Sequence, residues 1–296
     1  MTTVVVSDTA TPRDVWAALE AVHSVTYFTA EARAAHEAAG LRGFWRGYFA
    51  TRAAPLGPAA ASTVTAVFAG FAQDMVARAV PGVWSLVTPR AALAAREAGA
   101  VDALRRHGGD LTGVPGALPV LGRVVAALPA PGRALGAANA ALPGPAEPVA
   151  ALWWAATAVR ESRGDGHVAV LTAEGLDGLL PHVLRAAGEG AASVRDGLRD
   201  RLLDVRGFTP AAWARGADEL RTRGLLDTGG ALTAEGSALR LHLEARTDAL
   251  AATARWRAGW RPAPSPIRTP WAPQRREPGC RRGSTPFPAG VRRAGG

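Results

Sequence analysis

The stretch TPAAWARGADELRTRGLLDTGGALTAEG, residues 209–236, decides the fold of the second half of this chain. Thr209-Pro210 is typical of a helix start, because a threonine caps free amide groups and a proline fits the first helical position. Apolar positions then recur at helical spacing: Trp213, Ala217 and Leu220. After Gly224 the pattern predicts two short strands, within Leu225–Thr233, around an Asp-Thr-Gly-Gly turn. A long helix is expected from Ala234 to about residue 254.

The rest of the chain up to residue 254 predicts a mainly α protein. It is rich in Ala and poor in aromatic residues, a composition that favours helix over sheet. The start signal of residue 209 occurs twice more, at Thr11-Pro12 and Thr88-Pro89. Between these two starts, helices are expected over residues 31–39, 41–53 and 58–79.

We expect two helical domains. Residues 1–110 form the first domain, and residues 149–254 form the second, which ends in the helix–strand–strand–helix unit described above. Residues 111–148 contain seven prolines and many glycines, which predicts a connection between the domains, with room for short helices.

The positive charge of the chain is confined to its end. The formal net charge is +9, yet residues 1–254 carry 24 Arg and 24 acidic residues, and residues 255–296 carry ten Arg and one acid. The basic balance therefore does not indicate a nucleic-acid or membrane partner for the folded part. Residues 255–296 are expected to be disordered, and two origins stay open: a native basic tail, or a reading-frame change in GC-rich coding sequence.

Several site classes are excluded by residue content. The single cysteine, Cys280, lies in the tail, so the folded part holds neither a disulfide nor a thiolate metal site. The histidines lack ligand spacing, and no nucleotide or cofactor motif occurs, so we expect no metal and no cofactor. Ala53–Gln73 is uncharged, but its bulky residues follow one helical face, which favours a core helix over a membrane span. The first residues lack the basic start of a signal peptide, and a cytoplasmic protein is expected.

The order helix, Arg-Gly-Leu-Leu, tight hairpin, Leu-Thr-Ala-Glu-Gly, helix resembles winged helix-turn-helix domains of the MarR type, over about residues 194–250. Residues 12–254 also resemble the SalK-like helix-turn-helix family of actinobacteria. Four segments carry this resemblance: His23 with Tyr27-Phe28, residues 48–57, Val80-Pro81 with Trp84, and residues 163–167. The chain departs from that pattern at Phe71-Ala72-Gln73, where Phe-His-Pro is expected, and in its tail. The resemblance implies double-stranded DNA as a partner and a homodimer formed through terminal helices.

A DNA-reading face is predicted on the helix that begins at Pro210. With Trp213, Ala217 and Leu220 buried, the opposite face carries Ala211, Arg215, Asp218 and Thr222. The candidate DNA contacts are Arg215 and Thr222, with Arg221 and Arg223 on the flanks. Acidic neighbours and a hairpin tip without arginine argue against strong phosphate binding, so a structural winged helix is the alternative.

Five polar residues are candidates for a small-molecule pocket. Arg163-Gly-Asp-Gly-His167 predicts a turn that places a titratable His near the Asp165 carboxylate, although a simple helix–helix turn explains the same pattern. Arg52 precedes a rigid Pro-Leu-Gly-Pro segment and, with His23 or His167, could bind a carboxylate. The alternative is that Arg52 caps its own helix.

Two functions follow from these features. The first is a helix-turn-helix regulator that responds to a small molecule and binds DNA. The second is an accessory or catalytic protein of specialised metabolism in which the winged helix is structural and His23, Arg52 and His167 line the pocket. No catalytic residue is assigned, and the sequence favours a protein that is not an enzyme.

Overall fold

The computed structural model describes residues 3–4, 12–252 and 267–268. Its helices confirm the mainly α prediction. The first half contains α1 (Pro12–Phe28), α2 (Ala30–Ala38), α3 (Phe44–Ala53), α4 (Ala61–Val67), α5 (Gln73–Ala77), α6 (Pro89–His107), α7 (Val114–Ala126) and α8 (Ala134–Ala140). The second half contains α9 (Pro148–Ala173), α10 (Leu180–Ala187), α11 (Ala192–Arg206), α12 (Pro210–Thr222) and α13 (Ala234–Ala251). Two-residue strands, β1 (Thr3–Val4) and β2 (Ile267–Arg268), pair antiparallel.

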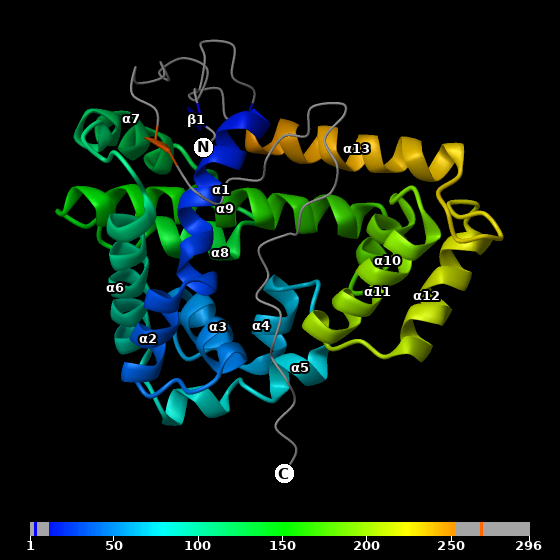
Figure 1. Cartoon of the computed structure of the whole chain (residues 1–296), viewed down its shortest axis with the longest axis horizontal. Helices are drawn as coiled ribbons and strands as arrows, with labels where there is room; N and C mark the ends of the chain where they lie inside the picture. The colour runs from blue at the N-terminus through cyan, green and yellow to red at the C-terminus, as the bar shows by residue number, and fades with distance from the viewer. Residues whose placement is uncertain (1–2, 5–11, 253–266, 269–296) are drawn as a thin grey trace.

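Helix α9 runs through the middle of the molecule, with α1, α6, α7, α8 and α13 packed against it (Figure 1). The Glu147 side chain caps its start by accepting hydrogen bonds from the amides of Val149 and Ala150 at 3.1 and 2.7 Å. At 1.5 Å per residue, its 26 residues extend about 39 Å. One helix therefore connects the N-terminal helices with α10, α11 and α12.

Three hydrophobic cores hold the helices together. The first lies among α1, α6, α7 and α9, and the second among α3, α4, α5 and α6. The third joins the end of α9 to α10, α12 and α13. The sequence-predicted connection, residues 111–148, contains α7 and α8, and Val114, Leu121 and Val124 of α7 are buried in the first core. That core therefore includes residues from both sides of this stretch.

The predicted turn at residues 163–167 is wrong, because these residues form continuous helix within α9. Glycine inside a helix costs about 1 kcal/mol relative to alanine, which is why the sequence predicts a break. Packing explains Gly166, since a Cβ atom there would collide with the Arg133 guanidinium. Tertiary contacts thus override the local preference of the Gly-Asp-Gly segment.

The predicted two-stranded wing is also not formed. Residues 225–233 make a tight loop with one antiparallel bridge, between Leu226 and Leu232. The Asp227 amide donates to the Ala231 carbonyl at 2.9 Å, and the Asp227 side chain accepts from the Ala231 amide at 2.8 Å. The Thr233 amide also donates to the Leu225 carbonyl at 3.1 Å, and the Thr233 side chain then caps α13 by accepting from the Gly236 amide at 3.0 Å, so the pairing ends where α13 begins.

Ala53–Gln73 forms short helical pieces, among them α4, whose Val64 is fully buried. Within residues 12–252, no helix combines the length and apolar character needed to cross a bilayer. The predicted disordered tail, residues 255–296, lies outside the described residues apart from Ile267–Arg268.

Candidate functional site

Helices α11 and α12 form a helix–turn–helix at one end of the molecule (Figure 1). Gly207 ends α11 with a positive φ of 77°, a backbone conformation that glycine adopts without strain. Thr209 then caps α12, as the sequence predicts, by accepting a hydrogen bond from the Ala212 amide at 3.1 Å. These two residues set the angle at which α12 leaves α11.

The faces of α12 agree with the sequence-based assignment. Ala217 and Leu220 are buried in the third core, and Trp213 packs partly buried against it. The opposite face is exposed to solvent: Ala211, Arg215, Asp218 and Thr222. This face is therefore open to a binding partner.

The four candidate DNA contacts differ in whether their side chains already bind other groups of the protein. Arg221 donates to the Asp218 carboxylate at 2.6 Å, and Arg223 donates to the carbonyls of Glu174 and Gly175 at 2.8 and 2.9 Å. The Thr222 hydroxyl donates to the Asp218 carbonyl at 3.0 Å. Within the described residues, Arg215 makes no ion pair or side-chain hydrogen bond. Arg215 is therefore the candidate that can reach a partner without breaking a contact.

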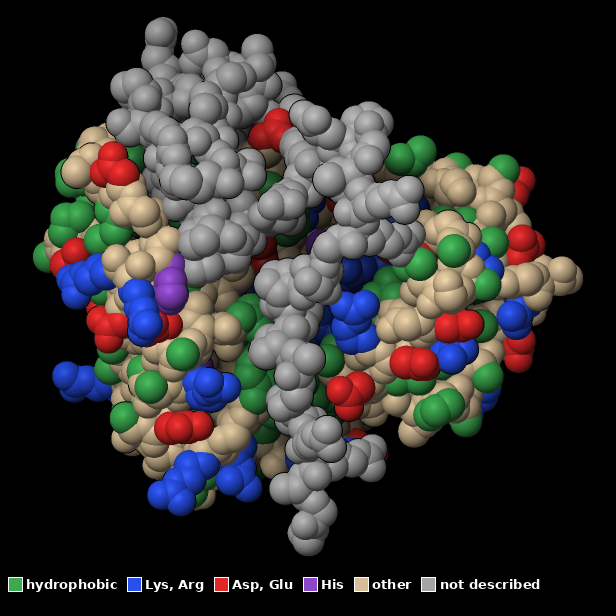
Figure 2. Space-filling model, in the orientation of Figure 1, with side chains coloured by type: hydrophobic (Ala, Val, Ile, Leu, Met, Phe, Trp, Pro, Cys, Tyr) green, Lys and Arg blue, Asp and Glu red, His purple; other side chains and the backbone are tan. Residues whose placement is uncertain are grey.

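A groove of about 610 Å³ separates α11 from α12, and its charges compensate one another. Arg199 pairs with Asp196 and Asp200 at 3.1 and 3.0 Å along its α11 side. Figure 2 shows acidic and basic side chains interspersed over this end of the molecule. Residues 180–250 contain ten Arg and ten acidic residues in total. This end of the molecule as a whole thus carries no net charge.

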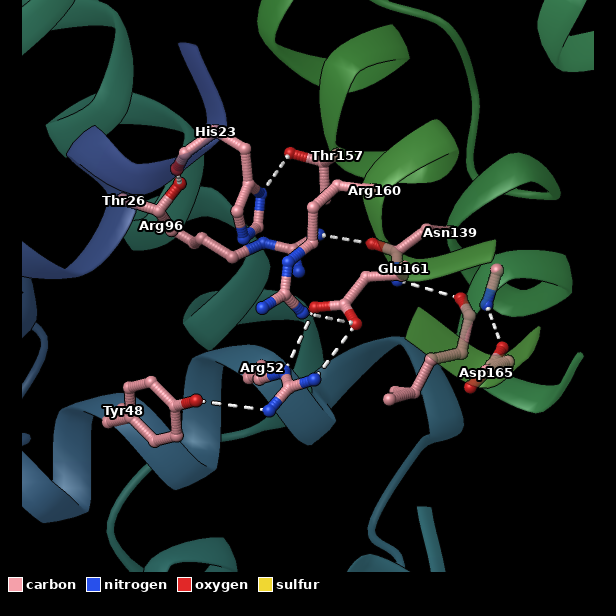
Figure 3. A network of polar contacts seen from close by, with 12 residues as sticks. His23, Thr26, Tyr48, Arg52, Arg96, Asn139, Thr157, Arg160, Glu161 and Asp165 are labelled. Carbon is pink, nitrogen blue, oxygen red and sulfur yellow. Dashed lines mark hydrogen bonds and ion pairs between the residues drawn. The ribbon is translucent and has the colours of Figure 1, made fainter. Parts of the chain in front are cut away.

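A buried ion network lies where α3 meets α9 (Figure 3). The Arg52 guanidinium donates to both oxygens of Glu161 at 2.9 and 3.0 Å and to the Tyr48 hydroxyl at 3.0 Å. Arg160 donates to Glu161 at 3.0 Å and to Glu20 of α1 at 3.1 Å. The interpretation of Arg52 as a cap of its own helix is wrong, because its guanidinium donates to Glu161 of α9 and to the Tyr48 hydroxyl of its own helix, not to the carbonyls at the end of α3.

The electrostatics of this network do not suit proton transfer. Burial acts to raise the pKa of Glu161, but the Arg52 and Arg160 guanidiniums outweigh it and hold that pKa well below its usual range. Burial, reinforced by the Arg160 charge, lowers the pKa of His23 to about 4. At neutral pH Glu161 is ionised and His23 is neutral, with its Nδ1 at 3.1 Å from the Thr157 hydroxyl. The arrangement fixes α1, α3 and α9 to one another.

The five candidate pocket residues do not form one site. His23 and Arg52 lie in the same buried network, whereas Arg163 and His167 face α13. Arg163 donates to Asp248 at 2.7 Å and stacks over Trp16 at 4.4 Å, and His167 Nδ1 lies 3.0 Å from the Thr247 hydroxyl. The expectation that His167 lines a pocket with Arg52 is therefore wrong.

Asp165 points in another direction and accepts a hydrogen bond from the Gly136 amide of α8 at 2.8 Å. Residues two apart on a helix are rotated by about 200°, so Asp165 cannot share a face with Arg163 or His167. Burial raises the pKa of the Asp165 carboxyl to about 6.

Sequence reasoning missed several charged residues of the interior. Glu161 and Arg160 occupy the centre of the network, and Arg96 donates to the Asn139 side chain at 3.0 Å while lying over Trp153. The sequence offered one sign of this network, the pair Arg160-Glu161 at the end of a long apolar run. Charged residues that continue a buried helix must be paired, because an unpaired buried charge is costly. Within the described residues, no cluster of His, Cys, Asp and Glu has the arrangement of a metal site.

Comparison with known proteins agrees with the helix–turn–helix geometry. Residues 12–261 match a family model described as a helix-turn-helix family. The chain belongs to this helix-turn-helix family. The match begins with the start of α1 and continues past α13. Helices α1 to α9, which we call the helical body, therefore belong to the same family unit as the helix–turn–helix. Searches of curated proteins and of solved structures found no match.

Proposed function

We propose that this protein is a DNA-binding regulator that reads the major groove with α12. The observation that supports this most is the exposed α12 face with Arg215, which has no ion-pair partner among the described residues, in a chain of the helix-turn-helix family. A recognition helix enters the major groove, where an arginine can bind a guanine through two hydrogen bonds. The MarR-type and SalK-like resemblance of the sequence supports the same assignment.

The charges around α12 determine what kind of DNA binding is expected. Residues 180–250 have no net charge, so the release of counterions from phosphates contributes little affinity. Arg221 must leave Asp218 before it can contact a phosphate. We therefore expect weak binding to random DNA and a larger share of the affinity from base contacts by Arg215.

A selection experiment with the full chain tests this proposal. Duplexes are enriched from a random-sequence pool at about 50 mM salt, where phosphate contacts are strong. Binding of the enriched duplex is then compared between the wild type, Arg215→Ala and the control Arg123→Ala. Arg123 is an exposed arginine of α7 on the helical body. A lost base contact of about 1–3 kcal/mol predicts that Arg215→Ala binds about 5- to 150-fold more weakly than the control.

The control removes the contribution of the tail. The ten arginines of residues 255–296 can bind DNA without sequence preference, and both variants retain them. Equal affinity of Arg215→Ala and Arg123→Ala, together with no sequence enriched from the pool, would overturn the proposal.

Dimerisation, a cytoplasmic location and a response to a small molecule complete the proposal. Leu241 of α13 is a large apolar side chain that is 74% exposed, which supports its face of α13 as a dimer surface. A two-fold dimer would select an inverted repeat with half-sites about one helical turn apart. The enriched sequences and light scattering of the purified chain test this point together.

One observation favours a second function. Arg221 and Arg199 of the helix–turn–helix are already ion-paired with neighbouring carboxylates of the same helices. This fits an accessory or catalytic protein of specialised metabolism in which the helix–turn–helix is structural. Undetectable DNA binding by the full chain at about 50 mM salt, despite its basic tail, would favour this function over the first.

A further inference from the structure

A pocket of about 380 Å³ lies between the end of α4, the segment before α8 and the last turns of α9. Its lining contains two charged residues, Arg133 and Asp165. The other lining residues are small and apolar: Ala66, Val67, Ala130, Gly132, Ala134, Val168 and Ala169. A volume of this size is in the range of small-molecule sites, which combine apolar walls with a few polar groups.

Arg133 is a buried cation without a carboxylate partner. It is 7% exposed, and within the described residues no acidic group lies at ion-pair distance from it. Its guanidinium donates to the carbonyls of Ser162 and Leu250, the latter at 3.2 Å, which uses two of its five N–H groups. The absence of a Cβ at Gly166 makes room for this guanidinium. The remaining N–H groups are available to an anion.

Asp165 is a buried acid, and no cation in the described part of the chain lies at ion-pair distance from it. It is 8% exposed, and the Gly136 amide donates to its Oδ2 at 2.8 Å. Its pKa, raised to about 6 by burial, reflects the missing partner. Although Arg133 and Asp165 line one pocket, they do not form an ion pair with each other.

We propose that this pocket binds a small zwitterion with an apolar side chain, of the α-amino-acid type. The ligand carboxylate would bind Arg133, its ammonium group would bind Asp165, and its side chain would lie against the Ala and Val residues of the wall. A buried charge is costly unless paired, so a ligand carrying both charges satisfies both residues at once. A simple carboxylate or a simple amine satisfies only one.

The pocket is also connected to the helix–turn–helix, and this part of the inference rests on the proposed function. Arg133 donates to the Leu250 carbonyl near the end of α13. Helix α13 begins directly after the Leu225–Thr233 loop, and its Gly236 lies against the Leu225 carbonyl, beside the end of α12. A ligand that draws Arg133 toward the pocket weakens the hydrogen bond between Arg133 and the Leu250 carbonyl. Helix α13 can then shift, and with it the position of α12.

The binding test uses the full chain at pH 7.5 and three probes of matched shape. L-leucine carries both charges, 4-methylpentanoate lacks the ammonium group, and 3-methylbutylamine lacks the carboxylate. Calorimetric titration is expected to show L-leucine binding at least tenfold more tightly than either analogue. Binding of 4-methylpentanoate as tight as that of L-leucine, or absence of L-leucine binding at 10 mM, would overturn the proposal.

Two variants locate the site. Asp165→Asn keeps an acceptor for the Gly136 amide but removes the charge, so L-leucine should bind at least tenfold more weakly while 4-methylpentanoate is unaffected. Ala66→Phe fills the rim of the pocket and should abolish L-leucine binding. Ser62→Phe, at another exposed position of the same helix that does not line the pocket, is the matched control. Equal loss in both phenylalanine variants would contradict the location.

The failure of this proposal can be distinguished from that of the proposed function. L-leucine binding is measured without DNA, and DNA binding by Arg215→Ala and Arg123→Ala is measured without L-leucine. L-leucine binding without any DNA binding supports the pocket and overturns the regulator. DNA binding without L-leucine binding supports the regulator and overturns the pocket.

Discussion

The ion pairs of α9 and those of α12 use the same residue types in opposite surroundings. Glu161 holds Arg52 and Arg160 with a side chain that is 1% exposed, whereas the Asp218 side chain that holds Arg221 is 72% exposed. A buried pair locks its elements together, because losing one partner leaves a charge without water or counter-charge. An exposed pair is worth little and can open. The buried ion pairs of α3 and α9 therefore hold these helices in place. The exposed arginines of α11 and α12 can leave their carboxylates and bind a partner instead.

The largest expected effect of this contrast is in Glu161→Gln. The variant keeps the shape of the side chain but leaves Arg52 and Arg160 without their common carboxylate. Breaking a buried pair in this way costs about 3–5 kcal/mol. Urea unfolding of the full chain should show a loss of free energy of unfolding in this range.

The control is Glu20→Gln, which removes the other carboxylate bound by Arg160. Its side chain is 29% exposed, so a loss of about 1 kcal/mol or less is expected. Equal losses in the two variants would mean that burial does not separate the two kinds of pair.

Acidification is expected to lower the free energy of unfolding by a smaller amount. The groups responsible are buried histidines outside α11 and α12. Burial lowers the pKa of His23, His36 and His182 from 6.5 to about 4, whereas α11, α12 and the loop after them contain no histidine. A histidine with a lowered folded-state pKa stabilises the fold above pH 6.5, and this contribution is lost as the pH falls toward 4. Asp165 acts in the opposite sense, because its raised pKa adds stability as the pH falls from about 6 toward 3.8.

The variant His23→Gln isolates one of these contributions. Gln can hydrogen-bond to Thr157 as His23 does, but it does not titrate. The unfolding free energy of the variant, measured from pH 7 to 4.5, should fall less steeply than that of the wild type. The difference in slope approaches about 1.4 kcal/mol per pH unit for one proton. His242→Gln, at an exposed position, is the control, and an unchanged slope in His23→Gln would contradict the assignment.

The parts of the fold that could be predicted from the sequence are those that depend on contacts between neighbouring residues. The Thr-Pro helix starts at residues 88 and 209 were predicted correctly, because an N-cap is a local contact between neighbouring residues. The break at Gly164 and Gly166 was predicted wrongly. There the helix continues, and the space left by Gly166 is occupied by the Arg133 guanidinium, a long-range neighbour that local preference does not reveal. The prolines of residues 111–148 are compatible with the short helices allowed there, since Pro115 and Pro148 sit in the first turns of α7 and α9, where proline is tolerated.

The candidate sites divide in the same way. The exposed face of α12 follows from helical periodicity, so Arg215 could be identified from spacing alone. Arg52 was identified, but its partner Glu161 lies 109 residues away and only the packed fold brings them together. The pocket at Asp165 needs Arg133 from a segment that the sequence predicts as a connection. A site formed by one helix can thus be predicted from the sequence, whereas a site formed between helices cannot.

The smallest effect on stability, and a gain in function, is expected for Asp218→Asn on α12. Opening an exposed pair changes the free energy of unfolding by about 0.5 kcal/mol or less. The change frees Arg221 and removes a negative charge from the α12 face that we propose contacts DNA. Affinity for the enriched duplex should rise several-fold at about 50 mM salt. The salt dependence should steepen by about one released ion, because one more arginine can reach a phosphate.

A double-mutant cycle shows whether Arg221 causes this gain. In Asp218→Asn with Arg221→Ala the gain should disappear, since the freed guanidinium is absent. Asp102→Asn, at an exposed position of α6 on the helical body, removes the same charge and should leave the affinity unchanged. A gain that survives in the double variant would assign the effect to the lost negative charge. A gain in Asp102→Asn would assign it to net charge, and in either case the exposed pair would not be the element that holds α12 away from DNA.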